Sequence, residues 1–471
     1  MMLHLAQLRF ATLRRFRPAA WQKAALAWIA PAVLTFVTVR YFRYPMLPAL
    51  HNVEALVLLL AVGCCAGFAL RSLRGAACRQ DKLEPGLRFT ACLLLFGLIA
   101  GEEGWFRWQQ YQVLQGSAAM ERMGRHFIVG FRDFGDVKPL AERGLIGGIY
   151  LTKRNIKNMS VRSLRRRIDE LQGVRRHAGL PPLFVMADQE GGSISHLSPL
   201  IEPMPSLASL LVDGMENLEA RACDYGERQG RALAALGVNM NLSPVVDLKP
   251  DGKGDWTDWR TRIERRAIAA DPRIVTRVAS AYGTGLAASG VQPTVKHFPG
   301  LGRVRGDTHF VQASLTSDPV ARAADWLPFR EVTANTGAAM MLAHVHLPDI
   351  DPRAPASLSR VLVQDILRKK GGNGWNYQGL LITDDLNMGA VYDEGIGRAA
   401  TAALDAGVDL VLVSYDHDQY YPALYAAAAA WRQGDIDTGR ETESAKRLDE
   451  YWTENRAKAA AGMAARPRCA D

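Results

Sequence analysis

Eight short apolar runs, separated by helix-forming stretches, most strongly constrain how residues beyond about 120 can fold. Each run is apolar along most of its length, as in strands that are buried on both faces of a parallel sheet. The runs are His126–Phe131, Gly148–Leu151, Leu183–Ala187, Asn239–Val246, Thr294–His297, Ala338–His344, Gly379–Thr383 and Asp409–Ser414. Helices are predicted between them, for example over Met159–His177, Asn217–Leu236 and Pro272–Ser289.

This alternation predicts the α/β class. Eight strands with intervening helices are the number that a (β/α)8 TIM-type barrel requires. An open doubly wound sheet is the alternative, but no Gly-rich phosphate turn follows the first run. We therefore predict a barrel over 123–471, closed by helices over Leu424–Trp431 and Thr442–Met463. The Gly- and Asp-rich stretch Asp251–Trp259 is predicted as a surface loop, with calcium binding as an alternative.

Polar residues follow five of the predicted strands at their C-terminal ends. Active sites of such barrels are built from this end, so the pattern favours an enzyme. The five polar segments are Asp188–Gly192, Asn241–Asp247, Lys296–Gly300 with Asp307–His309, His344–His346 and Thr383–Asp385. The His344 and His346 pair alone is a weak metal signal, because no third ligand stands at a suitable spacing.

Four of these motifs together resemble the bacterial β-N-acetylglucosaminidases of glycoside hydrolase family 3. They are D-Q-E-G-G from Asp188, K-H-F-P-G from Lys296, D-T-H from Asp307 and T-D-D-L-N-M from Thr383. The likeness covers roughly residues 120–420 in order and spacing. It implies a single-barrel glycosidase that removes terminal N-acetylglucosamine from cell-wall fragments, with no cofactor and no metal.

The resemblance implies a role for each matched residue. Asp384 corresponds to the nucleophile of a retaining mechanism, which needs a carboxylate to form a covalent glycosyl-enzyme. His309 corresponds to the acid/base on a mobile loop, with Asp307 to orient it; a histidine pKa of about 6.5 suits proton transfer near neutrality. The substrate-binding residues that it implies are Asp188, Lys296, His297 and Arg265, with Arg266 as the alternative to Arg265 if the register slips.

Three positions depart from the family pattern. The usual G-H-G is Gly300-Leu301-Gly302, the usual R-V after D-Q-E-G-G is Ser193-Ile194, and an aromatic position is Ala267. Because the catalytic trio is intact, we expect retaining hydrolysis of terminal β-linked N-acetylglucosamine in muropeptide or chitin-type oligosaccharides. Two alternatives stay open, a phosphorylase acting on the same glycosides and a non-catalytic, membrane-tethered glycan-binding protein.

Residues 1–104 lie outside this pattern and contain three uncharged apolar runs, Ala24–Val39, Ala55–Leu70 and Phe89–Gly101. Flanking Lys and Arg side chains can extend the first two to spanning length. The third has only 13 residues between Arg88 and Glu102 and is the weakest. We predict a membrane anchor of about three transmembrane helices and a juxtamembrane linker over 105–122; a soluble helical subdomain is the alternative.

The distribution of basic residues predicts the orientation of the anchor in the membrane. Basic residues crowd before the first run and between the second and third, whereas few lie between the first and second. By the positive-inside rule this predicts a cytoplasmic N-terminus and, after three crossings, a barrel outside the bacterial cytoplasmic membrane. If the third run does not span, the barrel stays inside.

The same distribution argues against nucleic acid as a partner. The chain has 57 Lys plus Arg, 48 Asp plus Glu and a net charge of +9. Residues 1–110 hold 13 basic and 5 acidic residues, so residues 111–471 are close to neutral. A basic groove is therefore not expected on the barrel. The expected partners are the oligosaccharide and, through residues 1–104, membrane lipid; the catalytic domain is expected to be a monomer.

Overall fold

The computed structural model describes residues 20–44, 47–250, 260–304, 307, 312–316, 318–392 and 394–460. The chain divides into two compact units, Met1–Trp105 and Phe106–Asp471, which we treat separately. Two predictions, the loop Asp251–Trp259 and the acid/base His309, lie outside the described residues.

The first unit is built from long helices, α1 (Ala20–Tyr41), α2 (His51–Gly75) and α3 (Arg79–Gln115), with a short 3-10 turn at Pro48–Leu50. All three are long and apolar enough to cross a membrane. Their outer faces carry large apolar side chains that are more than half exposed, such as Leu60, Phe68 and Leu94. An apolar surface of this kind suits a lipid surrounding.

The third apolar run, Phe89–Gly101, lies inside a helix of 37 residues. Arg88, which bounds the run at its start, and Glu103, which follows the bounding residue Glu102, have partners within the first unit. Arg88 lies 3.4 Å from Glu84 one turn earlier, and Glu103 lies 2.5 Å from Arg43. Paired charges are cheaper to place near lipid than isolated ones. The run that looks weakest in the sequence therefore belongs to a helix of sufficient length.

The second unit contains an eight-stranded parallel sheet whose order is β12-β9-β7-β6-β3-β2-β1-β13. A parallel bridge between Ile382 and Leu410 joins the two edges, so the sheet closes into the predicted barrel. The strands are β1 (Phe127–Val129), β2 (Gly148–Leu151), β3 (Phe184–Ala187), β6 (Met240–Asn241), β7 (Gln292–Phe298), β9 (Ala339–Leu342), β12 (Leu381–Thr383) and β13 (Val411–Val413).

All eight strands fall within or across the predicted runs. The largest difference is β6, which has two residues, although the sequence predicts a strand over Asn239–Val246. Pro244 lies in that run and has no backbone N–H to donate, so the ladder is interrupted there. Val245 still forms a parallel bridge with Lys296, which keeps this segment beside β7.

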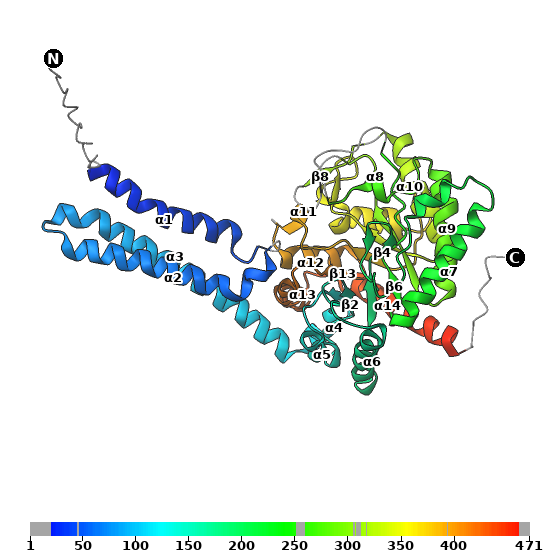
Figure 1. Ribbon diagram of the computed structural model, residues 1–471, viewed down its shortest axis with the longest axis horizontal. Helices are drawn as coiled ribbons and strands as arrows, with labels where there is room; N and C mark the ends of the chain where they lie inside the picture. The colour runs from blue at the N-terminus through cyan, green and yellow to red at the C-terminus, as the bar shows by residue number, and fades with distance from the viewer. Residues whose placement is uncertain are drawn as a thin grey trace, which may run out of the picture. The chain divides into compact units, whose positions relative to one another are not determined.

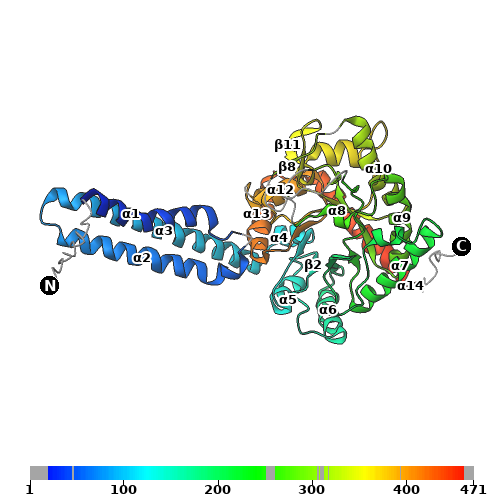
Figure 2. The same ribbon diagram turned by 45° about the horizontal axis from the view of Figure 1, so that its top comes forward.

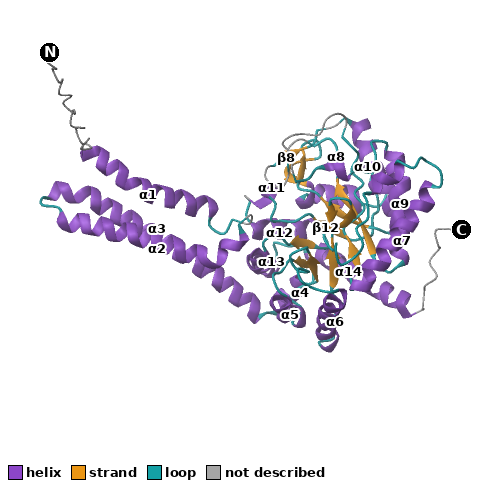
Figure 3. Cartoon of the chain, in the orientation of Figure 1, coloured by secondary structure: helices purple, strands orange, loops and turns teal. Residues whose placement is uncertain are grey.

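Helices surround the strands (Figures 1, 2 and 3). They are α4 (Ala118–Gly124), α5 (Phe134–Glu142), α6 (Val161–His177), α7 (Leu218–Leu236), α8 (Ile263–Arg266), α9 (Pro272–Ala288), α10 (Pro319–Thr336), α11 (Gly389–Tyr392), α12 (Ile396–Ala406), α13 (Tyr420–Gln433) and α14 (Thr438–Ala460), with a π-helix at Val361–Arg368. The start of α9 shows how sequence sets these boundaries. Asp271 accepts from the N–H of Arg273, and Pro272 occupies the first turn, where its missing N–H costs nothing.

Residues 105–122, predicted as a linker, are helical over most of their length through the end of α3 and the start of α4. Phe106 is buried, and its ring lies 6.4 Å from that of Tyr421 on α13. Trp108 similarly meets Tyr425, with ring centroids 5.2 Å apart. Residues 106–115 of α3 belong to the second unit, and these ring contacts pack them against α13 within that unit.

The inside of the barrel is filled by side chains that alternate with those facing the helices, as the period of a strand requires. One cluster holds Ile128, Phe184, Met186, Met240 and Leu412 together with Leu448 of α14. Tyr451 and Trp452 of α14 stack on Phe184, the first residue of β3, at 5.0 and 4.6 Å. Helix α14 thus closes the N-terminal end of the barrel and leaves the C-terminal end for the loops.

Three short strands fix the loops of the C-terminal end. The strands β8 (Ala313–Ser314), β10 (Val345–Leu347) and β11 (Asp351–Pro355) form a separate sheet in which β8 and β10 are parallel. The short strands β4 (Gln189–Gly191) and β5 (Ile194–Ser195) form a hairpin directly after β3. These additions hold the segments on which the predicted site residues lie.

Candidate active site

Lys296 is the centre of a buried charged cluster at the C-terminal ends of the strands. It lies on β7 and is 2% exposed. Its Nζ lies 2.7 Å from Oε1 of Glu190 on β4, and it also donates a hydrogen bond to Asp188, which follows β3. Asp188 accepts a second bond of 2.5 Å from the hydroxyl of Tyr150 on β2. Lys296 from β7 and Tyr150 from β2 therefore fix the carboxylate of Asp188 from two sides.

Arg266 extends this cluster. Its guanidinium makes two hydrogen bonds to Glu190, of 2.9 and 2.7 Å, in the paired geometry that suits a carboxylate. Its Nη2 also lies 3.3 Å from Nε2 of His297. The side chain of Arg265 is 65% exposed and lies 3.6 Å from Glu264. The structure brings Arg266 into the cluster and leaves Arg265 at the surface.

The protonation states in the cluster support one another. Burial alone would raise the pKa of Asp188, but the charges of Lys296 and His196 and its hydrogen bonds hold that pKa well below its usual value. Burial opposes ionisation of Glu190 as well, and Arg266 and Lys296 lower its pKa. Burial would lower the pKa of Lys296, and the two carboxylates raise it. The cluster is therefore a set of full charges, pre-arranged to bind neutral polar groups by charge-assisted hydrogen bonds.

His297 is oriented by Asp247. The Nδ1 atom of His297 lies 2.7 Å from Oδ2 of Asp247, which also accepts the backbone N–H of His297. Oδ1 of Asp247 accepts the N–H of Leu301 at 2.7 Å. Asp247 is fully buried. One carboxylate thus fixes both the imidazole and the start of the loop that leads to Asp307 and His309.

Asp384 and Asp385 follow β12 and have different surroundings. Asp385 accepts from the hydroxyl of Ser414 at 2.6 Å, from the backbone N–H groups of Tyr415, Ser414 and Asn387, and from the side chain of Asn387. These donors fix its carboxylate within the protein. The half-buried Asp384 accepts the N–H of Asp385 at 2.8 Å, and its own N–H donates to Leu342. Anchoring Asp385 therefore sets the backbone that presents Asp384.

Tyr150 lies within electrostatic range of both this pair and the charged cluster. Burial raises the pKa of Tyr150, and the charges of Asp188, Asp385 and Glu190 raise it further. Because the strands are parallel, the carboxylates that follow β3 and β12 lie at the same, C-terminal end of the barrel.

Asp307 lies apart from these residues in the sequence but is held firmly. It is 3% exposed and accepts from the N–H of Arg260 at 2.8 Å and from the hydroxyl of Thr261 at 3.1 Å. The loop on which it lies is anchored at one end by Leu301 and Asp247 and at the other by the pairing of β8 with β10. His309 lies outside the described residues, so its distance to Asp307 stays a prediction.

Sequence reasoning assigned no role to Glu190, Tyr150 or His196. Glu190 stands inside the D-Q-E-G-G motif, so its acidic side chain was a usable signal. Tyr150 and His196 stand in no motif, and only the folded chain brings the tyrosine hydroxyl to 3.4 Å from Nδ1 of His196.

His344 is another polar residue at a strand end, and both of its ring nitrogens are hydrogen-bonded. Nδ1 lies 2.6 Å from the hydroxyl of Ser357, and Nε2 lies 3.0 Å from the carbonyl oxygen of Asp385. Its geometry supports the Asp384–Asp385 segment.

An eight-stranded parallel barrel with ionised carboxylates, a lysine and an arginine around one opening is an enzyme fold with a site for a polyhydroxylated ligand. The class that this arrangement fits is the glycosidases, in which carboxylates act at an anomeric centre.

Comparisons with known proteins agree. The family model described as "Glycosyl hydrolase family 3 N terminal domain" matches residues 120–450. A β-hexosaminidase from Neisseria gonorrhoeae is 34% identical over 275 residues, which are 57% of this chain and 71% of that protein. One from Stenotrophomonas maltophilia is 33% identical over 278 residues, covering 57% and 76%.

Solved structures give the same result. A family 3 β-N-acetylglucosaminidase from a Paenibacillus species has a TM-score of 0.66 and 30% identity, over 73% of this chain and 63% of that one. A β-N-acetylhexosaminidase from Beutenbergia cavernae has a TM-score of 0.64 and 26% identity, over 72% and 99%. The chain belongs to glycoside hydrolase family 3 and is a glycosidase of the β-hexosaminidase group.

Proposed function

We propose that the chain hydrolyses terminal β-linked N-acetylglucosamine with retention, using Asp384 as nucleophile. The observation that carries this proposal is the difference in hydrogen bonding between two adjacent carboxylates. Five donors hold Asp385 in place, and this fixes the backbone on which the half-buried Asp384 stands. A rigidly presented carboxylate is what attack on an anomeric carbon needs.

The charged cluster would bind the sugar. Asp188 and Glu190 accept hydrogen bonds from hydroxyl groups, whereas Lys296 and Arg266 donate to them. Because the groups of the cluster are buried, ionised and already oriented, little free energy is spent on reorienting them when substrate binds. In this scheme His297, set by Asp247, contributes a further polar contact, and Arg266 takes the role that the sequence suggested for Arg265.

Proton transfer is assigned to His309 with Asp307. Asp307 is buried and held by Arg260 and Thr261, so it can fix and polarise a histidine two residues away. The imidazole would protonate the departing oxygen and then remove a proton from water, as microscopic reversibility requires. Leu301 replaces the histidine of the usual family loop and is 5% exposed, so this position offers the leaving group no polar contact.

The substrate is proposed to be a muropeptide or chitin-type oligosaccharide outside the cytoplasmic membrane, with residues 1–104 as the anchor. Three apolar helices and the alternating basic segments support this orientation.

The activity is tested with the full chain purified in a neutral detergent. An aryl N-acetyl-β-glucosaminide should release its chromophore, and free N-acetylglucosamine should appear with retained β-configuration at early times. Sugar 1-phosphate formed only in phosphate buffer would show a phosphorylase instead. Glycan binding without turnover, by protein with a cooperative melting transition, would show a binding protein and contradict the hydrolase.

The topology has its own test. A reporter that is active only in the periplasm, fused after residue 115, should be active. The same reporter fused after Gly75, between α2 and α3, is the matched control and should be inactive. The reverse pattern, or two inactive fusions with normal expression, would contradict the proposed orientation.

A further inference from the structure

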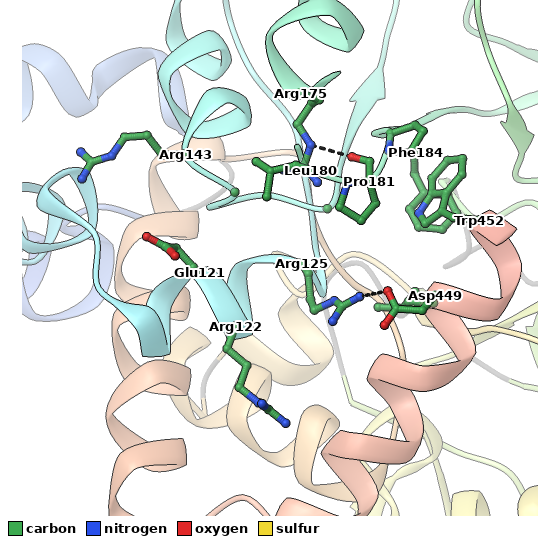
Figure 4. Close-up of a pocket in the computed structure, with 14 residues that line it drawn as sticks. Glu121, Arg122, Arg125, Arg143, Arg175, Leu180, Pro181, Phe184, Asp449 and Trp452 are labelled. Atoms are coloured by element: carbon green, nitrogen blue, oxygen red, sulfur yellow. Dashed lines mark hydrogen bonds and ion pairs between the residues drawn. The ribbon is translucent and has the colours of Figure 1, made fainter. Parts of the chain in front are cut away.

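A cavity of about 330 Å³ opens at the N-terminal end of the barrel, away from the candidate active site (Figure 4). Its walls come from α4, from the segments that lead into β2 and β3, and from α14. Phe184 and Trp452 supply an apolar wall. Four arginines, Arg122, Arg125, Arg143 and Arg175, line the cavity with two carboxylates, Glu121 and Asp449. The volume is within the range of small-molecule sites.

Arg175 is the unusual member of this set. It lies on α6, is 3% exposed, and donates to the carbonyl oxygens of Pro181, Ala141 and Ile146 at 2.8, 3.2 and 3.3 Å. Figure 4 shows the bond to Pro181 at the edge of the cavity. No carboxylate forms an ion pair with it in the described part of the chain. Its Nη2 makes no hydrogen bond with any described residue.

A buried charge without an opposite charge is costly, so proteins normally neutralise or pair it. Burial, followed by the neighbouring charge of Arg125, lowers the pKa of Arg175 to about 10. The guanidinium still carries its proton at neutral pH. The described groups that hydrogen-bond to this guanidinium are thus neutral carbonyl oxygens, although Glu121 and Asp449 line the same cavity.

The other arginines differ in whether a carboxylate neutralises their charge. Arg122 pairs with Glu441 and Arg125 pairs with Asp449. Arg143 donates only to carbonyl oxygens, those of Leu114 and Gln115 at the end of α3. Arg143 and Arg175 thus meet carbonyls in place of carboxylates. Figure 4 shows the Arg143 side chain directed away from the other residues that line the cavity, so Arg175 is the member whose charge an anion entering the cavity would neutralise.

We propose that this cavity is a phosphate-binding site, distinct from the glycosidase site and independent of the function proposed above. Phosphate carries up to two charges and several acceptor oxygens, which suits a set of guanidiniums better than one carboxylate does. Phe184 and Trp452 would contact the organic part of the ligand. The ligand is either a soluble phosphomonoester or the headgroup of a phospholipid; both present the same oxyanion.

Two variants test the charge and the volume of the cavity separately. Arg125→Gln removes a partly exposed cation of the cavity, and Leu180→Trp fills the cavity without changing its charge. Arg176→Gln is the matched control, because Arg176 is the exposed neighbour of Arg175 and does not line the cavity. Arg175→Lys is a further variant, and its melting temperature is measured first because three carbonyls depend on the guanidinium.

Calorimetry on the full chain in neutral detergent uses two probes, glycerol 3-phosphate and a short-chain phosphatidic acid. We expect at least one probe to bind, with affinity reduced about tenfold or more by Arg125→Gln and Leu180→Trp and less than about twofold by Arg176→Gln. Binding of the lipid alone identifies a headgroup site, and binding of the monoester identifies a soluble ligand. Failure of both probes at about 10 mM, or binding that survives Leu180→Trp, would overturn the proposal.

Discussion

The two ends of the barrel handle buried cations in different ways. At the C-terminal end, Lys296 is 2% exposed and contacts the carboxylates of Asp188 and Glu190. At the N-terminal end, Arg175 is 3% exposed and contacts carbonyl oxygens. The first cation is neutralised by the protein itself, whereas the second is not.

The surroundings differ in the same way. The carboxylates of the C-terminal end are fixed by tyrosine, lysine, arginine and backbone donors, which prepares them for a ligand with many hydroxyl groups. The N-terminal end is closed by aromatic side chains of α14 stacked on Phe184. The comparison indicates that one end carries the chemistry and the other carries stability, which is the usual division in this fold.

The largest effect should come from Asp384→Ala. Removing the proposed nucleophile should lower kcat by roughly 10⁴-fold or more, since catalytic units of this kind lose most of their rate with one member. The melting temperature should change little, because Asp384 is half-buried and Asp385 keeps its anchors. A loss smaller than about tenfold in kcat would exclude Asp384 from the covalent step.

Lys296→Met should damage both activity and folding. It leaves Asp188 and Glu190 buried without their shared cation, and breaking a buried ion pair in this way costs about 3–5 kcal/mol. Chemical denaturation measures the loss, and Lys249→Met, a change at an exposed lysine, is the control. Equal stability of the two variants would contradict a stabilising role for the ion pairs of Lys296.

Trp452→Ala, at the N-terminal end, should lower stability and leave activity at the C-terminal end unchanged. Loss of the ring that stacks on Phe184 should cost about 2–3 kcal/mol, at the low end for a large aromatic because Trp452 is only partly buried. At a temperature where the variant remains folded, kcat and KM should stay within about twofold of the wild type. A large change in KM with normal stability would show that the N-terminal end reaches the active site.

The smallest effect concerns pH. The folded pKa values of Asp188 and Glu190 lie below their unfolded values, so both carboxylates stabilise the fold at neutral pH. That stability should be lost as the pH falls below about 4.5, where the carboxylates of the unfolded chain take up protons. Thermal unfolding between pH 7 and 3 should show a shallower decline for Glu190→Gln than for the wild type. Parallel curves would contradict the assignment.

Much of the fold could be predicted from the sequence, because strands buried on both faces leave continuous apolar runs. All eight appear, and the start of α9 follows from Asp271 and Pro272. The length of β6 could not be predicted so well, since Pro244 interrupts its ladder. The third apolar run looked too short, because a window bounded by charge does not reveal that Arg88 and Glu103 have charged partners in the folded chain.

The site could be predicted less completely. Motifs located Asp188, Lys296 and Asp384, but the choice between Arg265 and Arg266 depends on one residue of helical rotation. Tyr150 stands in no motif and joins the site only when β2 lies beside β3. The N-terminal cavity has no sequence signature, because its arginines come from three separate segments.

The most direct test of the central claim is to trap the glycosyl-enzyme. A 5-fluoro derivative of N-acetylglucosamine with an activated β-leaving group should form a covalent adduct with the full chain. Digestion and mass spectrometry should place that adduct on Asp384, and Asp384→Ala should not be labelled. An adduct on another residue, or the same labelling of the variant, would contradict the account.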